Sequence, residues 1–384
     1  MNIAVIGKGT ASVITSLNML MRGHDVTIFF DPNTPHLNVG ESTTPLVGEL
    51  LYKSLGITIH EMVRTGIFSY KMGINFQGWG KSGNFYHDFV TNGLAHHFET
   101  VPFNAFIHKY LEEKKVFKYI GERVDSIEVE ENGVMVNNRV FDFVINCAGW
   151  SNDFEYEKPT LETVNSAVTF KKKYDYATTH TLHLATEDGW QFGLPFPEQG
   201  IFKCGYLYNK SQISEEKVRE KLKDEEIAFG ISWTPKYAPV LIDSPRSGMN
   251  GNRLFFFEPL QALSLHYVFV FSELMADYLD EPTPAKRDYI NTIYRHEIWT
   301  YELSLAFHYS YGSIHDSHFW RDIEKRASSM FGATLNGRPS SLKHNVLYDA
   351  VHVGLDGQSH SRVGIFGWQD VKTIYEGMTG DKIL

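Results

Sequence analysis

The stretch NIAVIGKGTASV, residues 2–13, decides the fold class of this 384-residue chain. It reads as a short apolar strand, a turn with glycines at Gly7 and Gly9, and the start of a helix that stays apolar to Met21. The first glycine allows a sharp turn, the second lets a pyrophosphate approach the backbone, and the helix N-terminus offers N–H groups to the phosphates. This order predicts a dinucleotide-binding unit.

Two further features of this region bear on that prediction. Ser12 stands where a third glycine is expected, which predicts slightly looser packing of the helix on the strand. A second strand, predicted over residues 26–30, leads to Asp31, about where an acid meets a ribose hydroxyl. A glycine pattern alone is a weak signal, and the order of strand, helix, strand and acid strengthens it.

Composition narrows the class of protein. The chain is 42% hydrophobic and 14% aromatic, which is enough for a large core, and its net charge of −10 argues against nucleic acid or an anionic membrane as partner. The N-terminus lacks the cationic segment of a signal peptide, and polar residues interrupt every apolar run before it could span a membrane. The only cysteines, Cys147 and Cys204, suit a reducing compartment. We therefore expect a cytoplasmic globular protein.

Periodicity predicts further elements along the chain. Helices are expected from Pro45 to Leu55, from Val101 to Lys115, and over four turns or more from His266. Strands are expected at 126–129, 134–136, 141–146 and 205–208, with a turn at 131–133. The strand at 141–146 runs into Cys147-Ala148-Gly149, a small-residue turn that returns to the nucleotide site. No repeat or linker divides the chain, so one interwoven body with discontinuous domains is expected.

Several ordered motifs together resemble one known family. They are GKGTAS at 7–12, GESTTP at 40–45, Lys71 ahead of Phe76 and Trp79, Trp190-x-Phe192-x-Leu194-Pro195, GNRLFFFEPLQALS at 251–264, and His308-Tyr309 with Phe319-Trp320. The chain resembles the flavin-dependent halogenases of the tryptophan-halogenase-like family, within the flavin monooxygenase superfamily. The resemblance covers roughly the first 325 residues.

The resemblance implies an α/β (α+β) fold, in which a Rossmann-like, three-layer FAD-binding module is interwoven with a substrate module of mixed β-sheet and helices. The FAD-binding module is expected to comprise residues 1–45, 100–160 and 245–275. The substrate module is expected to comprise residues 46–99, 161–244 and 276–384, with helices at its C-terminal end.

The resemblance also implies a set of site residues. Lys71 is the expected catalytic residue, Leu263 and Ser264 the halide site, and Gln261 a substrate contact; no metal is expected. The expected FAD-binding residues are Gly7, Gly9, Thr10, Ala11, Ser12, Asp31, Gly40, Glu41, Ser42, Thr43, Gly149, Trp190, Asn252 and Pro259.

The implied chemistry is halogenation of an electron-rich aromatic or heteroaromatic small molecule. Reduced FAD (FADH2) from a separate flavin reductase, O2 and a halide give hypohalous acid, which passes to Lys71; burial lowers the pKa of a lysine and makes its neutral amine accessible. The sequence does not identify the base that removes the proton from the aromatic ring. Whether the protein forms a homo-oligomer also stays open.

Departures from the family pattern qualify this reading. The second tryptophan of W-x-W-x-I-P is Phe192, the glutamate after EPL is Gln261, and Ser-Thr-Gly is replaced by Ala262-Leu263-Ser264. The length is short for a tryptophan halogenase, which favours a compact variant of a phage-encoded kind with a substrate other than free tryptophan. A less restrictive loop at Leu263-Ser264 would be compatible with bromide or iodide, and fastest turnover with chloride would argue against this.

Other interpretations stay open. Phe192 would favour a flavin monooxygenase that hydroxylates, and the altered halide loop a catalytically silent flavin-binding protein; a nicotinamide-dependent dehydrogenase is less favoured because it has no use for GESTTP. By residue type alone, Lys71 is a surface lysine and Glu41 a helix cap. Similarly, Trp190, Phe192 and residues 255–257 would be core residues, and His96, His97 and His266 would be structural or surface histidines. His315 and His318 have metal-ligand spacing but no third ligand.

Overall fold

The computed structural model describes residues 1–35, 37–89, 94–151, 154–173, 178–334 and 368–382. The chain forms two compact units of three segments each: Met1–Tyr70, Leu94–Lys158 and Pro235–His296 in the first, and Lys71–Gly93, Pro159–Thr234 and Glu297–Leu384 in the second. The first unit includes residues that the sequence assigned to the substrate module, namely 46–70, 94–99, 235–244 and 276–296, and residues 159–160 of the predicted FAD-binding module are in the second unit. Residues 335–367 of that predicted module lie outside the described residues.

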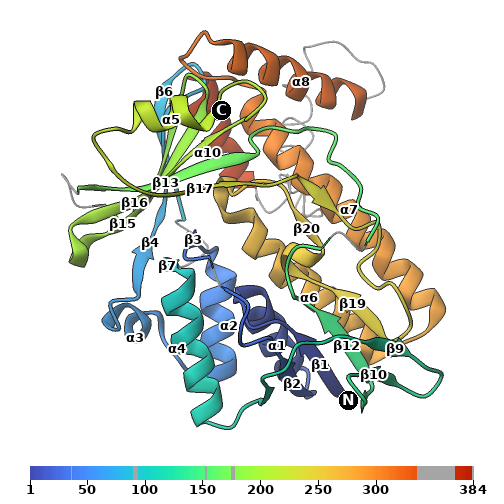
Figure 1. Cartoon of the computed structure of the whole chain (residues 1–384). Helices are drawn as coiled ribbons and strands as arrows, with labels where there is room; N and C mark the ends of the chain where they lie inside the picture. The colour runs from blue at the N-terminus through green and yellow to red at the C-terminus, as the bar shows by residue number, and fades with distance from the viewer. Residues whose placement is uncertain (36, 90–93, 152–153, 174–177, 335–367, 383–384) are drawn as a thin grey trace. The chain divides into compact units, whose positions relative to one another are not determined.

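A sheet of five parallel strands, in the order β19-β12-β1-β2-β8, is the centre of the first unit (Figure 1). The strands are β1 (Asn2–Ile6), β2 (Asp25–Phe29), β8 (Lys118–Ile120), β12 (Phe143–Asn146) and β19 (Ser247–Met249). Residues 3–6 of β1 are all buried, as expected of a central strand with both faces covered. Helix α1 (Thr10–Met21) connects β1 to β2, which confirms the predicted strand, turn, helix and strand.

The parallel sheet is the middle of three layers. On the side of α1 pack α2 (Pro45–Leu55), α4 (Thr100–Glu113) and α6 (Leu263–Asp280). On the other side lies an antiparallel sheet of β9 (Ile127–Val129), β10 (Val134–Val136) and β11 (Arg139–Phe141). Val134, Val136 and Phe141 of this small sheet form one apolar cluster with Ala4 and Phe29 of the parallel sheet. The predicted three-layer module is confirmed.

The predicted single strand at 141–146 is wrong: the chain changes sheets at Asp142. Phe141 ends β11, which pairs antiparallel with β10, and Phe143 begins β12, which pairs parallel with β1. Asp142 is fixed between them, since its N–H donates to the Asn2 carbonyl at 2.9 Å and its Oδ2 accepts from the Asn2 N–H at 2.7 Å. These long-range hydrogen bonds have no local sequence signal.

The remaining elements of the first unit include two small sheets, β3-β7-β4 and β18-β20, and several short helices. They are β3 (Gly40–Ser42), α3 (Ile59–Arg64), β4 (Phe68–Lys71), β7 (Ala95–Glu99), β18 (Lys236–Tyr237), η2 (Gly251–Arg253), β20 (Phe255–Phe256) and η3 (Leu260–Ala262). Pro45 is at the start of α2 as predicted, and Gly56, with φ 72°, ends that helix in the left-handed conformation. Helix α6 begins at Leu263, three residues before the predicted start.

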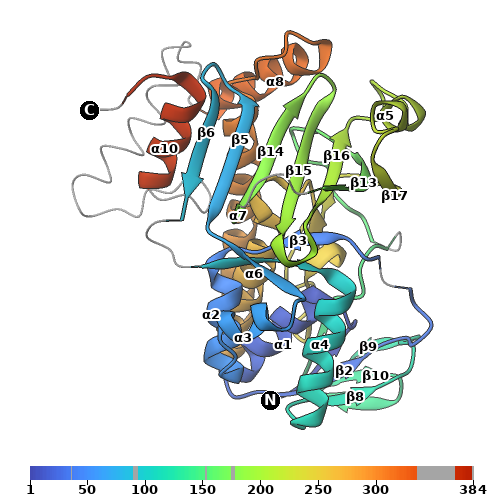
Figure 2. The same cartoon turned by 90° about the vertical axis from the view of Figure 1, so that its left-hand side faces the viewer.

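The second unit is built on a mixed sheet of seven strands, in the order β17-β13-β16-β15-β14-β5-β6 (Figure 2). The strands are β5 (Gly73–Trp79), β6 (Gly83–Asp88), β13 (Ser166–Lys173), β14 (His180–Thr186), β15 (Gly189–Phe196), β16 (Ile201–Tyr208) and β17 (Glu226–Ser232). Only β14 and β5 pair in parallel. The helices are η1 (Pro197–Gln199), α5 (Glu215–Lys221), α8 (His318–Thr334) and α10 (Trp368–Thr379), while α7 (Pro284–Tyr309) contributes its C-terminal half.

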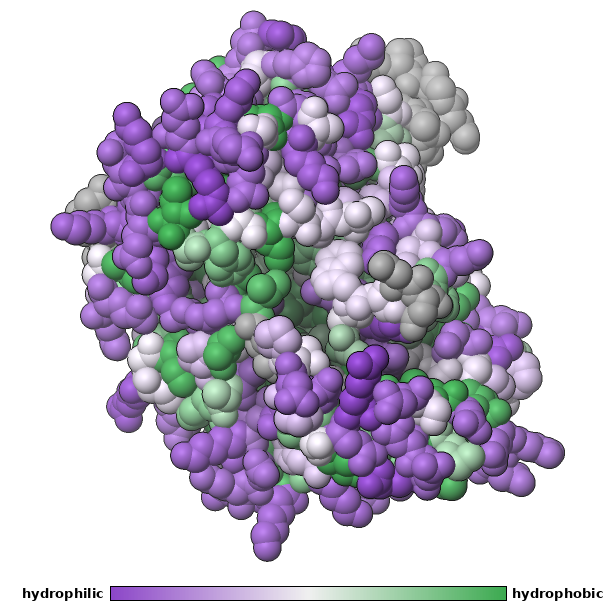
Figure 3. Space-filling view, in the orientation of Figure 1, coloured by the Kyte–Doolittle hydropathy of each residue, from purple (hydrophilic) through white to green (hydrophobic). Residues whose placement is uncertain are grey.

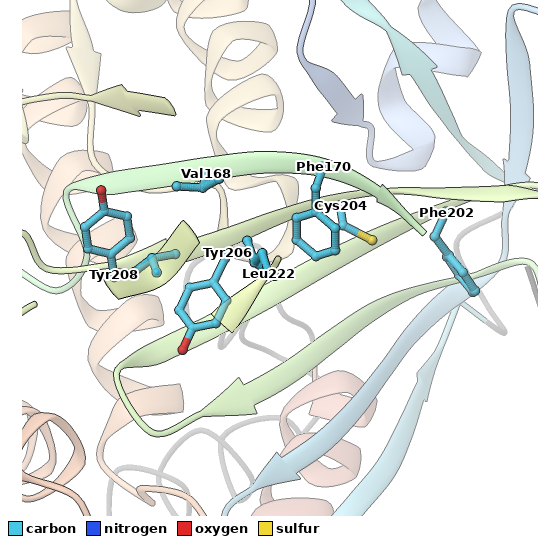
Figure 4. Packing of buried hydrophobic residues seen from close by; sticks show 8 residues of the cluster. Val168, Phe170, Phe202, Cys204, Tyr206, Tyr208 and Leu222 are labelled. Carbon is cyan, nitrogen blue, oxygen red and sulfur yellow. The ribbon is translucent and has the colours of Figure 1, made fainter. Parts of the chain in front are cut away.

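One end of this sheet has its own apolar cluster. Val168 and Phe170 from β13 gather with Tyr206 from β16 and with Leu222 at the end of α5 (Figure 4). At the other end, α10 packs along β6 (Figure 2). The surface seen in Figure 3 is mainly hydrophilic. Among the described residues, no helix has the length and apolar character needed to cross a bilayer.

Candidate functional site

The glycine turn after β1 has the shape that a dinucleotide requires. Gly7 has φ +115°, and a Cβ there would lie 2.7 Å from the carbonyl oxygen of Cys147. Gly9, by contrast, is the N-cap of α1, with φ −101° and no side-chain cap hydrogen bond. A Cβ on Gly9 would meet no described atom within 4 Å, so the space above the first turn of α1 is open. Gly7 therefore serves the turn, and Gly9 leaves room for a phosphate.

The first turn of α1 packs closely despite the missing third glycine. The Ser12 side chain is buried, and its Oγ donates a hydrogen bond to the Gly9 carbonyl at 2.9 Å. Close approach is provided instead by Gly251 in η2, where a Cβ would lie 2.4 Å from the Cβ of Ala11. The expectation of looser packing is thus offset by a glycine far along the chain.

The strand order places the candidate dinucleotide site between β1 and β12. The chain places β2 on one side of β1 and later places β12 on the other side. The order in which strands are added therefore reverses between β1 and β12. Ligands of open α/β sheets bind at such a point, outside the carboxyl ends of the strands. Gly149 follows β12 with φ +85° and open space around its Cα, like Gly9 after β1. Asp31 follows β2, and its Oδ1 accepts the Asn33 N–H at 2.8 Å; its contact with a ribose stays a prediction.

The GESTTP segment is a strand leading to a helix and not a free turn. Gly40, Glu41 and Ser42 form β3, and Thr43 is tied to β7: its N–H donates to the His96 carbonyl at 2.9 Å. The Glu41 Oε2 accepts from Thr10 Oγ1 at 3.1 Å, so Glu41 contacts the first turn of α1 and does not cap α2. Burial raises the pKa of Glu41 to about 7.

The loop before α6 holds the expected halide and substrate residues. Gln261 and Ala262 both adopt left-handed conformations, with φ 58° and 60°, although neither is glycine. Such strain is typical of functional loops, and it aims the following residues, Leu263 and Ser264, into the N-terminus of an 18-residue helix. Leu263 and Gln261 are buried, whereas Ser264 is half-buried.

Two other residues of this loop differ in exposure. Asn252 is exposed and Pro259 is half-buried. Sequence reasoning missed Asn250, whose buried amide donates to Thr15 Oγ1 at 3.0 Å and to the Val268 carbonyl at 2.9 Å, binding the loop to α1 and α6. Its place before Gly251 is a turn signal that could have drawn attention to it.

Lys71 is fully buried and not a surface lysine. It ends β4 and begins the second unit, and its Nζ lies 5.3 Å from the centre of the Phe89 ring. Desolvation lowers the pKa of Lys71 from 10.5 to about 7, so a substantial fraction of the amine is neutral at neutral pH. A buried amine of this kind can act as a nucleophile.

Several aromatic side chains of the second unit pack against one another in its core. Trp190 is fully buried, and its ring centre lies 6.1 Å from that of Trp79. Phe76 stacks on His308 at 5.7 Å, so the late His-Tyr motif is part of the same core. Phe192 covers Gly205, where a Cβ would lie 2.4 Å from the phenyl ring.

Histidines in the second unit make contacts other than metal ligation. His315 hydrogen-bonds through Nε2 to the Ala185 carbonyl at 3.1 Å, and His87 pairs through Nε2 with Asp370 Oδ1 at 2.9 Å. In the first unit, His97 bonds to Ser69 and His96 to Thr43. Within the described ranges, no group of three His, Cys, Asp or Glu residues could hold a metal ion.

Comparison with known proteins assigns these features to a family. A family model described as tryptophan halogenase matches residues 2–116 and 90–332. The chain belongs to the tryptophan halogenase family. Tryptophan 7-halogenase RebH of Lentzea aerocolonigenes is 23% identical over 425 residues, which cover 83% of this chain and 78% of RebH. Tryptophan 6-halogenase ThaL of Streptomyces albogriseolus is 19% identical over 423 residues, with the same shares covered.

Solved structures of halogenases share the fold. The tryptophan halogenase from Shewanella frigidimarina NCIMB 400 superposes with a TM-score of 0.81 at 16% identity, over 100% of this chain and 90% of that one. The flavin-dependent halogenase BrvH from Brevundimonas sp. BAL3 gives a TM-score of 0.78 at 16% identity, over 98% of this chain and 89% of its own.

Family membership makes this chain a flavin-dependent halogenase, an oxidoreductase whose cofactor is FADH2. The first unit fits that group, because open space above Gly9 and Gly149 meets the bare N-terminus of α1 at the reversal of the sheet. The individual roles assigned to the site residues remain predictions.

Proposed function

We propose that this halogenase acts on an electron-rich aromatic or heteroaromatic small molecule by passing hypohalous acid to Lys71. The observation that carries the proposal is the fully buried amine of Lys71, whose pKa is lowered to about 7 by burial. A neutral amine attacks the halogen of hypohalous acid, and a protonated one polarises it. Aromatic surroundings such as Phe89 keep competing water away from the oxidised halogen.

FADH2, when bound, would supply two of the four electrons that reduce O2, and the halide would supply the other two as it is oxidised to hypohalous acid. A separate flavin reductase is the proposed source of FADH2. In this proposal, Gly7, Gly9 and the first turn of α1 hold the pyrophosphate, and Glu41 orients that turn through Thr10. Both cysteines are unpaired and buried, which supports a reducing, cytoplasmic setting.

The proposed halide site is the start of α6. Two successive left-handed residues before a helix turn backbone N–H groups toward one point, and a long helix adds the positive end of its dipole. Leu263 and Ser264 occupy that first turn, so a halide would be bound by backbone and not by a cationic side chain.

The proposed substrate is an indole or another electron-rich ring. The matched relatives carry tryptophan in their names, which makes free tryptophan the first compound to test. Gln261 cannot remove a proton, although the family has a glutamate at this position, and this supports a substrate other than free tryptophan. Tryptophan-containing peptides, phenols and anilines complete the panel.

The test is a mass-spectrometric screen of this panel with FAD, a flavin reductase and chloride, bromide or iodide. Wild type is compared with Lys71→Ala and Lys71→Met, and with the exposed Lys81→Ala as matched control. The proposal expects halogenated product from wild type and Lys81→Ala only, with equal FAD affinity throughout. Hydroxylated product without halide would favour the monooxygenase reading that Phe192 leaves open, and FAD binding without product would favour a silent flavoprotein.

A further inference from the structure

Several buried polar side-chain atoms of the second unit have no hydrogen-bond partner in the part of the chain that the structure describes, and three of them lie among the same aromatic rings. These three are Nδ1 of His183 and the indole Nε1 atoms of Trp79 and Trp190. The residues are 2%, 0% and 0% exposed, respectively. Buried donors and acceptors are nearly always paired, so three orphans in one region need a common explanation.

The strand register brings these residues together on one face of the sheet. His183 of β14 pairs with Phe76 of β5 on one side and with Phe192 of β15 on the other. The His183 ring centre lies 4.9 Å from Trp190 and 5.1 Å from Phe76. The Trp79 ring centre lies 5.8 Å from that of Phe76 and 6.1 Å from that of Trp190. The three side chains with unpaired nitrogen atoms therefore belong to one aromatic cluster.

Their chemistry defines what could satisfy them. Each indole N–H can only donate, so each of the two tryptophans requires an acceptor. A neutral imidazole can accept at one nitrogen, and burial, with the charges of Lys71, His308 and His87, lowers the pKa of His183 well below 6.5 and keeps it neutral. Two donors and one acceptor match a single hydroxyl group, whose oxygen accepts twice and whose hydrogen is donated once.

We propose that Trp79, Trp190 and His183 form a binding site for one small hydroxylic molecule within the aromatic core of the second unit. Its oxygen accepts from both indole N–H groups, and its O–H donates to His183 Nδ1. Water is the resident ligand. Hypohalous acid also has a hydroxyl group and would bind to the same three nitrogen atoms. This second part of the proposal, the binding of hypohalous acid, rests on the proposed function.

In that second part, His183 is a positioning residue for the reaction at Lys71. The amine nitrogen forms a bond to the halogen as the oxygen–halogen bond breaks, and the proton lost by the amine joins the departing hydroxide to make water. His183 holds the hydroxyl end and leaves the halogen end free for attack. The proximity that this requires is consistent with the effect of the Lys71 charge on His183.

The resident ligand is tested without turnover, in crystals of the full chain grown with and without bromide. The proposal expects an electron-density peak within hydrogen-bond distance of at least two of the three nitrogen atoms, with no anomalous bromide signal. In solution, the Trp79 and Trp190 indole protons should show cross-peaks to water in ¹⁵N-edited spectra, assigned with Trp79→Phe and Trp190→Phe. An empty site, or one that takes up bromide, would overturn the proposal whatever the enzyme's activity.

The role of His183 in positioning hypohalous acid is tested with two substitutions of this residue. His183→Asn retains an acceptor, whereas His183→Leu removes it. We expect Leu to release more free hypohalous acid per FADH2 consumed, by a factor of three or so (about 0.7 kcal/mol), and Asn to restore wild-type coupling. Equal coupling in both variants would refute the role while leaving the resident water intact. If His183→Leu fails to fold, Trp190→Phe provides the same comparison against wild type.

Discussion

Alanine substitutions at the two glycines of the turn after β1 are expected to damage the protein in different ways. At Gly7 the new Cβ would lie 2.7 Å from the Cys147 carbonyl oxygen and 3.0 Å from its carbon, both backbone atoms that cannot move aside. At Gly9 it would meet nothing within 4 Å among the described atoms, and φ is already −101°. Gly7→Ala should therefore damage the fold, and Gly9→Ala only the cofactor site.

The magnitudes follow from these contacts. A side chain at the Gly7 φ of +115° costs about 1–3 kcal/mol in backbone strain. The steric overlap adds about 1–3 kcal/mol. The free energy of unfolding should fall by about 2–6 kcal/mol, a large part of the stability of most proteins. Gly9→Ala exchanges one N-cap residue for a poorer one, at less than about 1 kcal/mol.

The assay combines denaturant unfolding without cofactor and FAD titration followed by flavin fluorescence. Gly9→Ala should shift the unfolding midpoint only slightly, by less than about 1 kcal/mol in stability, but bind FAD at least about tenfold more weakly (about 1.4 kcal/mol), because its methyl group occupies the space left for pyrophosphate. Gly7→Ala should unfold at a lower denaturant concentration than wild type, whether or not FAD is present. Wild-type FAD affinity in Gly9→Ala would refute the placement of the cofactor over α1, and wild-type stability in Gly7→Ala would refute the close approach to Cys147.

Three further predictions concern pH and packing. Because burial lowers the Lys71 pKa to about 7, the unfolded chain binds the extra proton between pH 7 and 10.5. Wild type should therefore lose stability relative to Lys71→Met as the pH falls through that range, by at most about 1.4 kcal/mol per pH unit, and parallel unfolding curves at pH 7 and 9.5 would contradict this. The Glu41 pKa is raised to about 7, so its stabilising contribution should disappear as the pH rises from 4.5 to 7; Glu41→Gln should gain on wild type over that interval in thermal unfolding. Gly205→Ala should lower stability by about 1–3 kcal/mol, because its Cβ would lie 2.4 Å from the Phe192 ring; Gly193→Ala, with its nearest atom at 3.3 Å, should cost clearly less, and equal losses would argue against this packing.

Local patterns predicted the nucleotide-binding half of the fold well. The glycine turn, the Pro45 helix start and the alternation at 134–136 are properties of neighbouring residues, and each predicted element is present. The division at Asp142 could not be predicted because it depends on hydrogen bonds to Asn2, which lies 140 residues earlier in the sequence. The early start of α6 depends on left-handed Gln261, a conformation that a glutamine gives no reason to expect.

The candidate site divides in the same way. Lys71 and the glycines were found through motifs, although lysine as a residue type favours the surface and only the motif context indicated burial. His183 was missed because its neighbours come from strand pairing: Phe76 lies far away in sequence and joins it only through the parallel register of β14 and β5. The sequence of β14 offered no sign of this, because its leucines, Leu182 and Leu184, are half-buried while His183 lies on the buried face.

The most direct test of the central claim is to ask whether the Lys71 amine takes up oxidised halogen. The full chain is supplied with FAD, flavin reductase, O2 and bromide in thiol-free buffer without aromatic substrate, and is then digested and analysed by mass spectrometry for the bromine isotope doublet. We expect one bromine on the peptide that carries Lys71, retained in Lys81→Ala and absent in Lys71→Met. Bromine spread over exposed residues in wild type and Lys71→Met alike would contradict transfer through this lysine.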